Sequence, residues 1–347
     1  MNAKRATGAV TDVARRAGRL ITSLPGRLII SAGLLGLVAR SIDWEVLSDR
    51  LSGAAWGWFA VGTALVVLAL LVGAVRWHAL LHHAQLPARP RETLRAYGIG
   101  IFSNNFLPTA FGGDVVRAWL VARSGKPLAR AFTSVVVDRS VALVSLFLLG
   151  WIGLVLSPVN VPRELVTPFV IASGAGVLVA ALAVAVLRRR GWSRFLPSLV
   201  RPWASEIAAT LRAYGRDHRV QAEALVLSLG FQVLMVTSIW TLSRALQLDI
   251  SPVILAVVIP LVLIATLIPI SVAGFGVREG AYVLLLGELG VSAGEATLLS
   301  LFSVAALAIA SLPGGVAIAL GGQGREIEHL ASMPAERPVT IDQSPIR

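Results

Sequence analysis

Charged side chains that stand within apolar segments are the residues of this sequence best placed to do chemistry. Six of them form three close pairs: Asp114 with Arg117, Asp138 with Arg139, and Arg278 with Glu279. An arginine guanidinium is a planar donor that matches the oxygens of a phosphate. A neighbouring carboxylate would balance the arginine or meet a cationic group. The pairs therefore predict binding of a charged headgroup, and we expect no catalytic residue among them.

These charges are unusual because the rest of the chain is strongly apolar. Of 347 residues, 56% are hydrophobic and 14% are charged, and the mean hydropathy is +0.76. Soluble domains carry about 25% charged residues, so the surplus of apolar side chains must face lipid. The composition predicts an all-α polytopic membrane protein. A charge that faced lipid would cost several kcal/mol, so each must pair or meet water.

Several other function classes are not expected. The net charge is +12, but Lys and Arg cluster between apolar runs as topology signals do, so we expect no nucleic-acid partner. There is no cysteine and no P-loop pattern. His78, His82 and His83 follow an apolar run without a zinc signature, so we expect neither a metal nor a cofactor.

Six apolar runs predict full membrane spans. They are residues 28–39, 54–75, 131–156, 165–187, 224–243 and 296–321. The first run is short, and we interpret it as an uncleaved span with an arginine at each end. The last contains Pro313-Gly314-Gly315, which predicts a kink.

Two further uncharged segments, 96–113 and 250–277, are interrupted by proline and glycine. The interrupting residues are Pro108, Gly112 and Gly113 in the first, and Pro269, Gly274 and Gly276 in the second. A broken backbone is tolerated at membrane depth only where protein or water surrounds it. We therefore predict two re-entrant helical hairpins. Asn104 and Asn105 either add neutral hydrogen bonds to a ligand or cap the first hairpin.

The two interrupted segments resemble each other. Pro, Gly, Val and Arg recur at the same spacing, as Pro108, Gly113, Val116 and Arg117 and as Pro269, Gly274, Val277 and Arg278. Each half of the chain, 28–157 and 165–321, would then hold three spans and one hairpin. With the hairpins entering from opposite faces, this is an inverted-topology repeat within a single transmembrane domain, 28–321.

The distribution of basic residues predicts the orientation. The basic tail 1–27, the loop 188–219 with its eight arginines and the tail 322–347 all lie on the side richer in Lys and Arg. By the positive-inside rule both termini are cytoplasmic. Within the loop, apolar residues recur at helical spacing over about 191–217, which predicts an amphipathic interfacial helix. The tail from residue 322 is polar, and we predict it to be disordered.

Three motifs in order carry a resemblance to a known family. They are Asn104-Asn105-Phe106-Leu107-Pro108 with Gly112-Gly113-Asp114 and Arg117, then Ser134 with Asp138-Arg139, then Pro269 with Gly274-Phe275-Gly276-Val277-Arg278-Glu279-Gly280. Over about residues 25–322 the chain resembles the transmembrane region of bacterial lysylphosphatidylglycerol synthases. It is equally similar to the stand-alone flippase-like membrane proteins of that superfamily.

The resemblance implies a protein of the bacterial inner membrane that moves a lipid between leaflets. In the two-part synthases this region translocates an aminoacylated phosphatidylglycerol. The soluble aminoacyl transferase domain is expected to be absent here, so we expect a transporter and not an enzyme. The expected partner is an anionic or aminoacylated phospholipid, or a polyprenyl-phosphate-linked lipid. Arg117 and Arg278 would hold the phosphate, and Asp114, Asp138 and Glu279 would balance them or meet a cationic headgroup.

Two other readings of the sequence stay open. In one, the protein is a non-transporting partner that scaffolds a glycosyltransferase or a lipid-modifying enzyme, with the basic interfacial helix as its docking surface. In the other, it is an intramembrane transferase that uses Asp114. The charges also have a purely structural interpretation, as an ion-pair network that locks the hairpins to the spans.

Overall fold

The computed structural model describes residues 51–106, 112–123, 126–156, 161–188, 201–267, 271 and 274–320, together with Gly36 and Arg40. Several predicted features lie outside the described residues. They are most of the span 28–39, both tails, the first part of the interfacial helix, Pro108 and Pro269.

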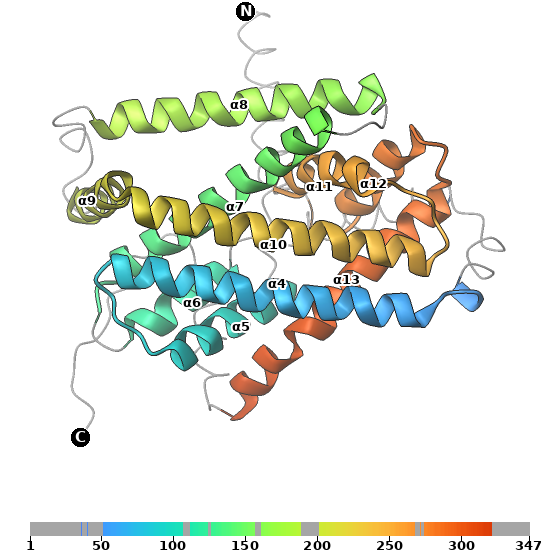
Figure 1. The fold of residues 1–347 in the computed structure, drawn as a ribbon. Helices are drawn as coiled ribbons and strands as arrows, with labels where there is room; N and C mark the ends of the chain where they lie inside the picture. The colour runs from blue at the N-terminus through green and yellow to red at the C-terminus, as the bar shows by residue number, and fades with distance from the viewer. Residues whose placement is uncertain are drawn as a thin grey trace, which may run out of the picture.

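The described residues fold into helices (Figure 1). They are α4 (Trp56–His83), α5 (Pro90–Phe106), α6 (Gly112–Ala122), α7 (Leu128–Leu156), α8 (Arg163–Arg188), α9 (Arg201–Arg216), α10 (His218–Ala245), α11 (Pro252–Leu267), α12 (Val277–Gly287) and α13 (Ala293–Leu320). Within the described ranges there is no strand, which agrees with the predicted all-α class.

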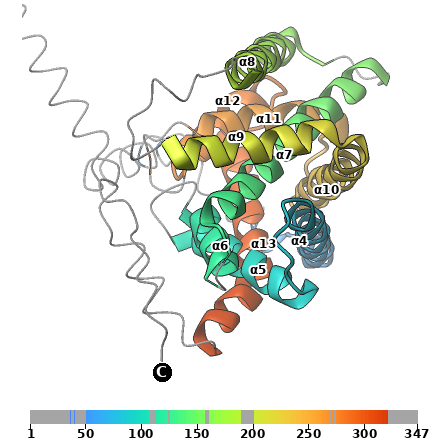
Figure 2. The same cartoon turned by 90° about the vertical axis from the view of Figure 1, so that its left-hand side faces the viewer.

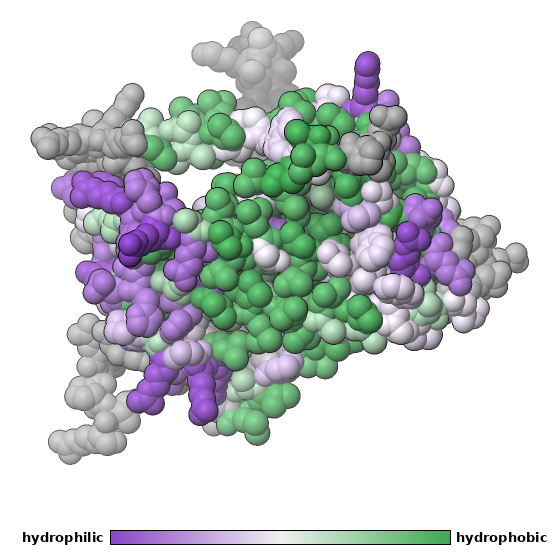
Figure 3. Space-filling view, in the orientation of Figure 1, coloured by the Kyte–Doolittle hydropathy of each residue, from purple (hydrophilic) through white to green (hydrophobic). Residues whose placement is uncertain are grey.

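Five of the described helices are long and apolar enough to cross a bilayer, namely α4, α7, α8, α10 and α13. They coincide with five of the six predicted spans. On the face in Figure 3, hydrophobic residues cover the middle and hydrophilic residues gather toward the two sides. Figures 1 and 2 both place α8 along the edge of the bundle, where most of its side chains are exposed. The chain is therefore a multi-pass membrane protein.

Helices α4 and α10 pack antiparallel along most of their length. Gly62 makes this possible, because a Cβ there would lie 2.8 Å from Thr241 Oγ1 and 2.9 Å from Leu242 Cδ2. The Ser238 hydroxyl of α10 donates to the Gly62 carbonyl over 2.8 Å. Small residues at a contact between membrane helices let the backbones approach, and hydroxyl groups then bridge them.

The first interrupted segment forms a helical hairpin of α5 and α6. The backbones touch at Gly100 and Gly113, where a Cβ on Gly113 would overlap the Gly100 carbonyl. The Gly113 backbone N–H donates to the Asn104 side-chain oxygen over 2.8 Å. Asn104 of α5 thus binds the backbone in the first turn of α6. The amide of Asn105 donates to Ser311 of α13 over 2.9 Å.

The second interrupted segment contains α11, and its glycines lie between α11 and α12. Gly274 and Gly276 have φ of +78° and +83°, a conformation that costs little only for glycine. They allow the chain to turn sharply into α12, which packs on α13. Helix α13 continues through Pro313 to Leu320. The neighbouring Gly314 provides room for a backbone contact with Gly98 of α5.

The amphipathic helix is described as α9, and its apolar side packs on the protein. Ala208 and Tyr214 are buried, and the Tyr214 hydroxyl donates to the Leu80 carbonyl of α4. Burial raises the pKa of the Tyr214 hydroxyl above its ordinary value. Arg130 of α7 pairs with Glu206 of α9 over 3.1 Å. The side of α9 that carries these residues is therefore covered by α4 and α7.

Candidate functional site

Five charged side chains from α4, α6 and α7 form one connected set, here called the first charge cluster. Its members, in order of contact, are Arg76, Asp138, Arg117, Asp114 and Arg139. Arg76 Nε lies 2.7 Å from Asp138 Oδ1, and Arg117 Nη2 lies 2.9 Å from Asp138 Oδ2. The cluster thus joins the α5–α6 hairpin to two membrane spans.

Asp114 is the second carboxylate of the cluster and lies in the first turn of α6, where the helix dipole favours a negative charge. The spacing of three residues brings Arg117 onto the same face, and its Nε lies 3.0 Å from Asp114 Oδ1. Arg139 donates to both carboxylate oxygens, over 2.8 Å and 3.1 Å. Sequence neighbours Asp138 and Arg139 point different ways, since Asp138 is buried and Arg139 has 46% of its side chain exposed.

Arg117 is almost completely enclosed, with 2% of its side chain exposed. Its guanidinium carbon lies 4.8 Å from the centre of the Trp77 ring and 5.2 Å from that of Tyr97. Aromatic faces stabilise a buried cation in this way. Its Nη1 atom is buried and has no hydrogen-bond partner. Because an unpaired buried donor is costly, this atom marks where an additional acceptor would be favourable.

Arg76 is a member of the cluster that the sequence analysis missed. The predicted span 54–75 ends one residue before Arg76. Helix α4 instead continues to His83, so Arg76 lies within the helix and is 2% exposed. Its Nη1 donates to Ser228 of α10 over 2.7 Å. The apolar residues after Arg76, including Leu80 and Leu81, indicate in the sequence that α4 continues beyond this charge.

The first charge cluster carries an excess of positive charge. It holds three arginines and two aspartates, so it carries one net positive charge although each arginine contacts a carboxylate. The two aspartates are each shared between two arginines, so neither fully balances its partners. An anion placed beside Arg117 and Arg139 would restore neutrality, and Arg139 is the member that such an anion could reach.

The second charge cluster consists of Arg278, Glu279 and Ser300. Glu279 is fully buried and pairs with Arg278 Nε over 3.3 Å. Its carboxylate also accepts from the Ser300 hydroxyl over 3.1 Å and from the Gly276 backbone N–H over 2.6 Å. Arg278 has 20% of its side chain exposed, yet its Nη2 atom is buried without a partner. Both carboxylate oxygens of Glu279 therefore have partners within the protein, whereas Arg278 Nη2 has no hydrogen-bond acceptor.

The hairpin that carries part of the first cluster and the second cluster itself contact α13 at different points. Asn105 of the first hairpin contacts Ser311, and Glu279 contacts Ser300. Eleven residues of helix separate these contacts by about 16 Å. Among the described residues, no ion pair connects the clusters. The predicted residues Asp114, Arg117, Asp138 and Arg139 thus come together, whereas Arg278 and Glu279 form a separate site.

The described residues contain no group of three or more His, Asp and Glu side chains that could hold a metal ion. His78 and His82 contact each other, with ring centres 5.0 Å apart, and His78 shares a hydrogen bond of 3.0 Å with Thr93. These histidines therefore have structural partners. Gly112 is the first residue of α6.

Comparison with known proteins gives a consistent result. The family model described as the lysylphosphatidylglycerol synthase TM region matches residues 26–315. Two UPF0104 membrane proteins of Methanothermobacter thermautotrophicus are similar to the chain. One is 26% identical over 322 residues, which cover 83% of this chain and 95% of the relative. The other is 25% identical over 271 residues, covering 70% and 77%.

No solved structure matches the chain. The family match extends over both interrupted segments, both charge clusters and most of the membrane spans. It confirms the resemblance that the three sequence motifs indicated. The chain therefore belongs to the family of the lysylphosphatidylglycerol synthase transmembrane region.

Proposed function

We propose that the protein is a lipid translocase, which moves a phosphate-bearing lipid between membrane leaflets with the headgroup bound at the two charge clusters. The observation that carries the proposal is a pair of unpartnered, buried guanidinium nitrogens, Arg117 Nη1 and Arg278 Nη2. Both arginines lie in a helix that begins at the end of an interrupted segment, at matching positions of the predicted repeat. If the charges formed only a structural ion-pair network, these two buried N–H donors would still lack an acceptor.

A phosphate suits these positions. Its oxygens accept from guanidinium groups, and the starts of α6 and α12 favour an anion. Arg139 and Arg278 are the accessible arginines, with 46% and 20% of their side chains exposed. Arg117 would contact the phosphate only after a shift of its neighbours, since it is enclosed by Asp114 and two aromatic rings. Before such a shift, Arg117 helps to position Arg139, because both arginines bind the carboxylate of Asp114.

Movement between leaflets would follow from the arrangement of the hairpins. The α5–α6 and α11–α12 pairs would enter the membrane from opposite faces as an inverted repeat, and one half would move against the other. The proposed lipid is a phospholipid, an aminoacylated one included, or a polyprenyl-phosphate-linked lipid. The protein would act in the bacterial inner membrane with both termini in the cytoplasm, as a transporter and not as an enzyme.

Native mass spectrometry of the purified full chain tests the headgroup role. We expect a phosphate-bearing lipid to remain bound to the wild type and to be lost from Arg139→Gln and Arg278→Gln. Arg244→Gln is a matched control, because Arg244 has a similarly exposed side chain, one ion pair with Asp249 and one ring contact with Trp240. Equal lipid retention in all four proteins would remove the headgroup role from both clusters.

The alternative of a scaffold for a lipid-modifying enzyme is supported by α9. The apolar side of this helix is covered by the protein, while Arg212 and Arg216 lie on its exposed side. Co-purification of such an enzyme, together with absence of lipid exchange by the purified chain, would favour this alternative.

A further inference from the structure

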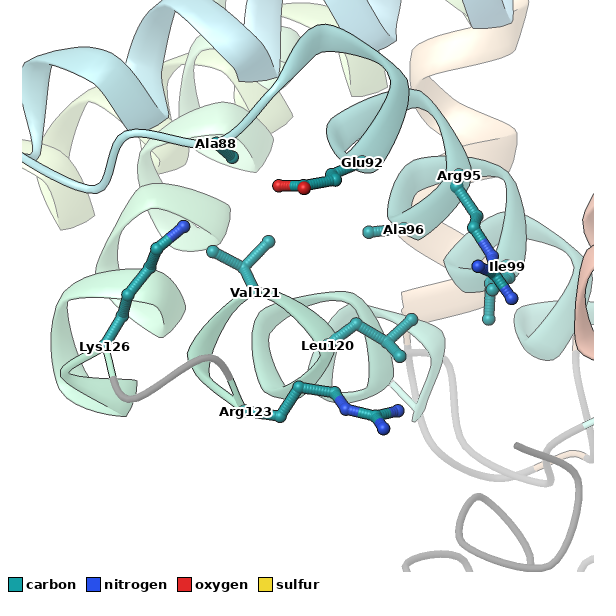
Figure 4. A pocket seen from close by; sticks show the side chains of 9 residues that line it. All are labelled: Ala88, Glu92, Arg95, Ala96, Ile99, Leu120, Val121, Arg123 and Lys126. Atoms are coloured by element: carbon teal, nitrogen blue, oxygen red, sulfur yellow. The ribbon is translucent and has the colours of Figure 1, made fainter. Parts of the chain in front are cut away.

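Helix α5 separates two hollows of different character. The first, here called the apolar groove, lies between α4, α5 and α13 and has a volume of about 330 Å³. Leu71, Leu94, Ile101 and Pro313 line it, and Arg91 and Arg95 lie at its border. The second, here called the basic pocket, has a volume of about 120 Å³ and includes Arg95, Arg123, Lys126 and Glu92 (Figure 4).

Arg95 lines both hollows. On a helix, Arg91, Leu94, Gly98 and Ile101 share one face, while Glu92, Ala96 and Ile99 share another. Arg95 falls between these faces, which is why it borders both. Its Nη2 donates to the Ala317 carbonyl of α13 over 3.1 Å, so the guanidinium is held at the junction.

The charge of the basic pocket favours an anion. Three cationic side chains line it against the single carboxylate of Glu92. Glu92 accepts from the Arg89 backbone N–H over 3.2 Å, and the Lys126 ammonium donates to the Pro87 carbonyl. In Figure 4, Arg95 and Arg123 extend toward one end of the pocket and Glu92 and Lys126 toward the other. The two arginines thus make this end of the pocket cationic.

A ligand that occupies the apolar groove and also contacts the basic pocket must have an anionic part next to an apolar part. The apolar groove opens beside α4 residues Val67 and Leu71, which are 41% and 42% exposed on a membrane-spanning helix. A ligand in the groove is therefore in contact with lipid. A phospholipid has this chemistry, with its phosphate one glycerol unit away from its acyl chains.

The apolar groove also connects to the first charge cluster. Tyr97 lines the groove, and its ring lies 5.2 Å from the guanidinium carbon of Arg117. We propose that a phospholipid binds along α5, with its phosphate at Arg95 and one acyl chain in the apolar groove. This deepens the proposed translocase function, since the bound lipid lies one side chain away from the cluster that would receive its headgroup.

A phosphatidylglycerol with a photoreactive diazirine in one acyl chain tests this site. The full chain is reconstituted with this probe in liposomes, irradiated, and analysed by mass spectrometry for labelled peptides. We expect labelling of α4 and α13 residues that line the groove. A diacylglycerol with the same photoreactive chain but no phosphate should label them several-fold less. Equal labelling by both probes would contradict recognition of the phosphate.

Two variants with matched controls sharpen the test. Arg95→Gln removes the shared cation, whereas Arg219→Gln removes an exposed arginine that lines neither hollow. Leu71→Trp fills the groove, whereas Leu68→Trp adds the same bulk to an exposed position on α4 outside it. We expect labelling to fall several-fold in the first variant of each pair only. Leu71→Trp stays informative if loss of the Arg95–Ala317 bond impairs folding.

Unchanged labelling in all four variants would overturn the proposal, because the probe would then report bulk lipid. The proposed function fails in a different way. If the groove is labelled as expected but the protein does not exchange lipid between leaflets, the site stands and translocation is wrong. If lipid exchange is observed while the groove stays unlabelled, translocation stands and this site is wrong.

Discussion

Arg117 Nη2 lies 2.9 Å from Asp138 Oδ2, and both side chains are only 2% exposed. This ion pair connects the α5–α6 hairpin to α7. The other oxygen of the same carboxylate binds Arg76 of α4. One buried carboxylate therefore holds together three elements that come from different parts of the chain. Any movement of the hairpin against the spans must break this contact or carry Asp138 along.

Asp138→Asn removes the charge that two buried arginines share, with little change in shape. We expect it to destabilise the protein by about 3–5 kcal/mol, because Arg76 and Arg117 then lack their common counter-charge. Thermal unfolding in detergent would measure the loss. Asp249→Asn is the control, since Asp249 is 91% exposed and its pair with Arg244 should contribute less than about 1 kcal/mol. Equal unfolding midpoints for the two variants would contradict a central role for Asp138.

Gly113→Ala should open the hairpin of α5 and α6. The new Cβ would overlap the Gly100 carbonyl and approach the Asn104 side chain. Because the obstructing atom belongs to the backbone, we expect a cost of about 1–3 kcal/mol and weaker lipid binding. Gly230→Ala provides the comparison, because nothing lies within 4 Å of its added Cβ. Stability of the Gly113 variant at or above that of the Gly230 variant would mean that the helices do not need this close approach.

Glu279→Gln tests whether Glu279 positions Arg278 and α12 or only caps the start of that helix. Glu279 binds Arg278, Ser300 and the Gly276 backbone, so loss of its charge should cost about 1–3 kcal/mol and disturb the position of Arg278. Glu295→Gln is a matched change, since Glu295 accepts from the Ser292 backbone at the start of α13 in the same way. A larger loss of bound lipid is expected for Glu279→Gln alone. Similar lipid retention in both variants would assign Glu279 a capping role only.

The predicted inverted repeat has a direct topological test. The chain has no cysteine, so Arg123→Cys and Val291→Cys each introduce a single reactive thiol. An impermeant maleimide added to intact cells should label position 291 and leave position 123 unlabelled until the membrane is opened. Labelling of both positions from the same face would contradict the inverted arrangement of the hairpins.

Hydropathy predicted most of the fold, because a span must be long and apolar whatever surrounds it. It placed the end of α4 too early, because it ended the span at the first charged residue, Arg76. That rule fails here since Arg76 is neutralised by Asp138 and the helix continues. The sequence also singled out Asp138 and Arg139 but not their opposite exposure, which depends on the neighbours of α7. The separation of Glu279 from the first cluster could not be predicted, because it depends on where two hairpins contact α13.

The proposed translocation is tested most directly by the exchange of fluorescent phosphatidylglycerol between the leaflets of proteoliposomes. Chemical quenching of the outer leaflet would measure the rate. The wild type and Arg244→Gln should exchange the lipid faster than protein-free liposomes. Arg278→Gln, incorporated to the same extent, should be slower by about tenfold, the effect of losing roughly 1.4 kcal/mol of headgroup stabilisation. Wild-type rates no faster than those of empty liposomes, or undiminished exchange by the Arg278 variant, would contradict the proposal.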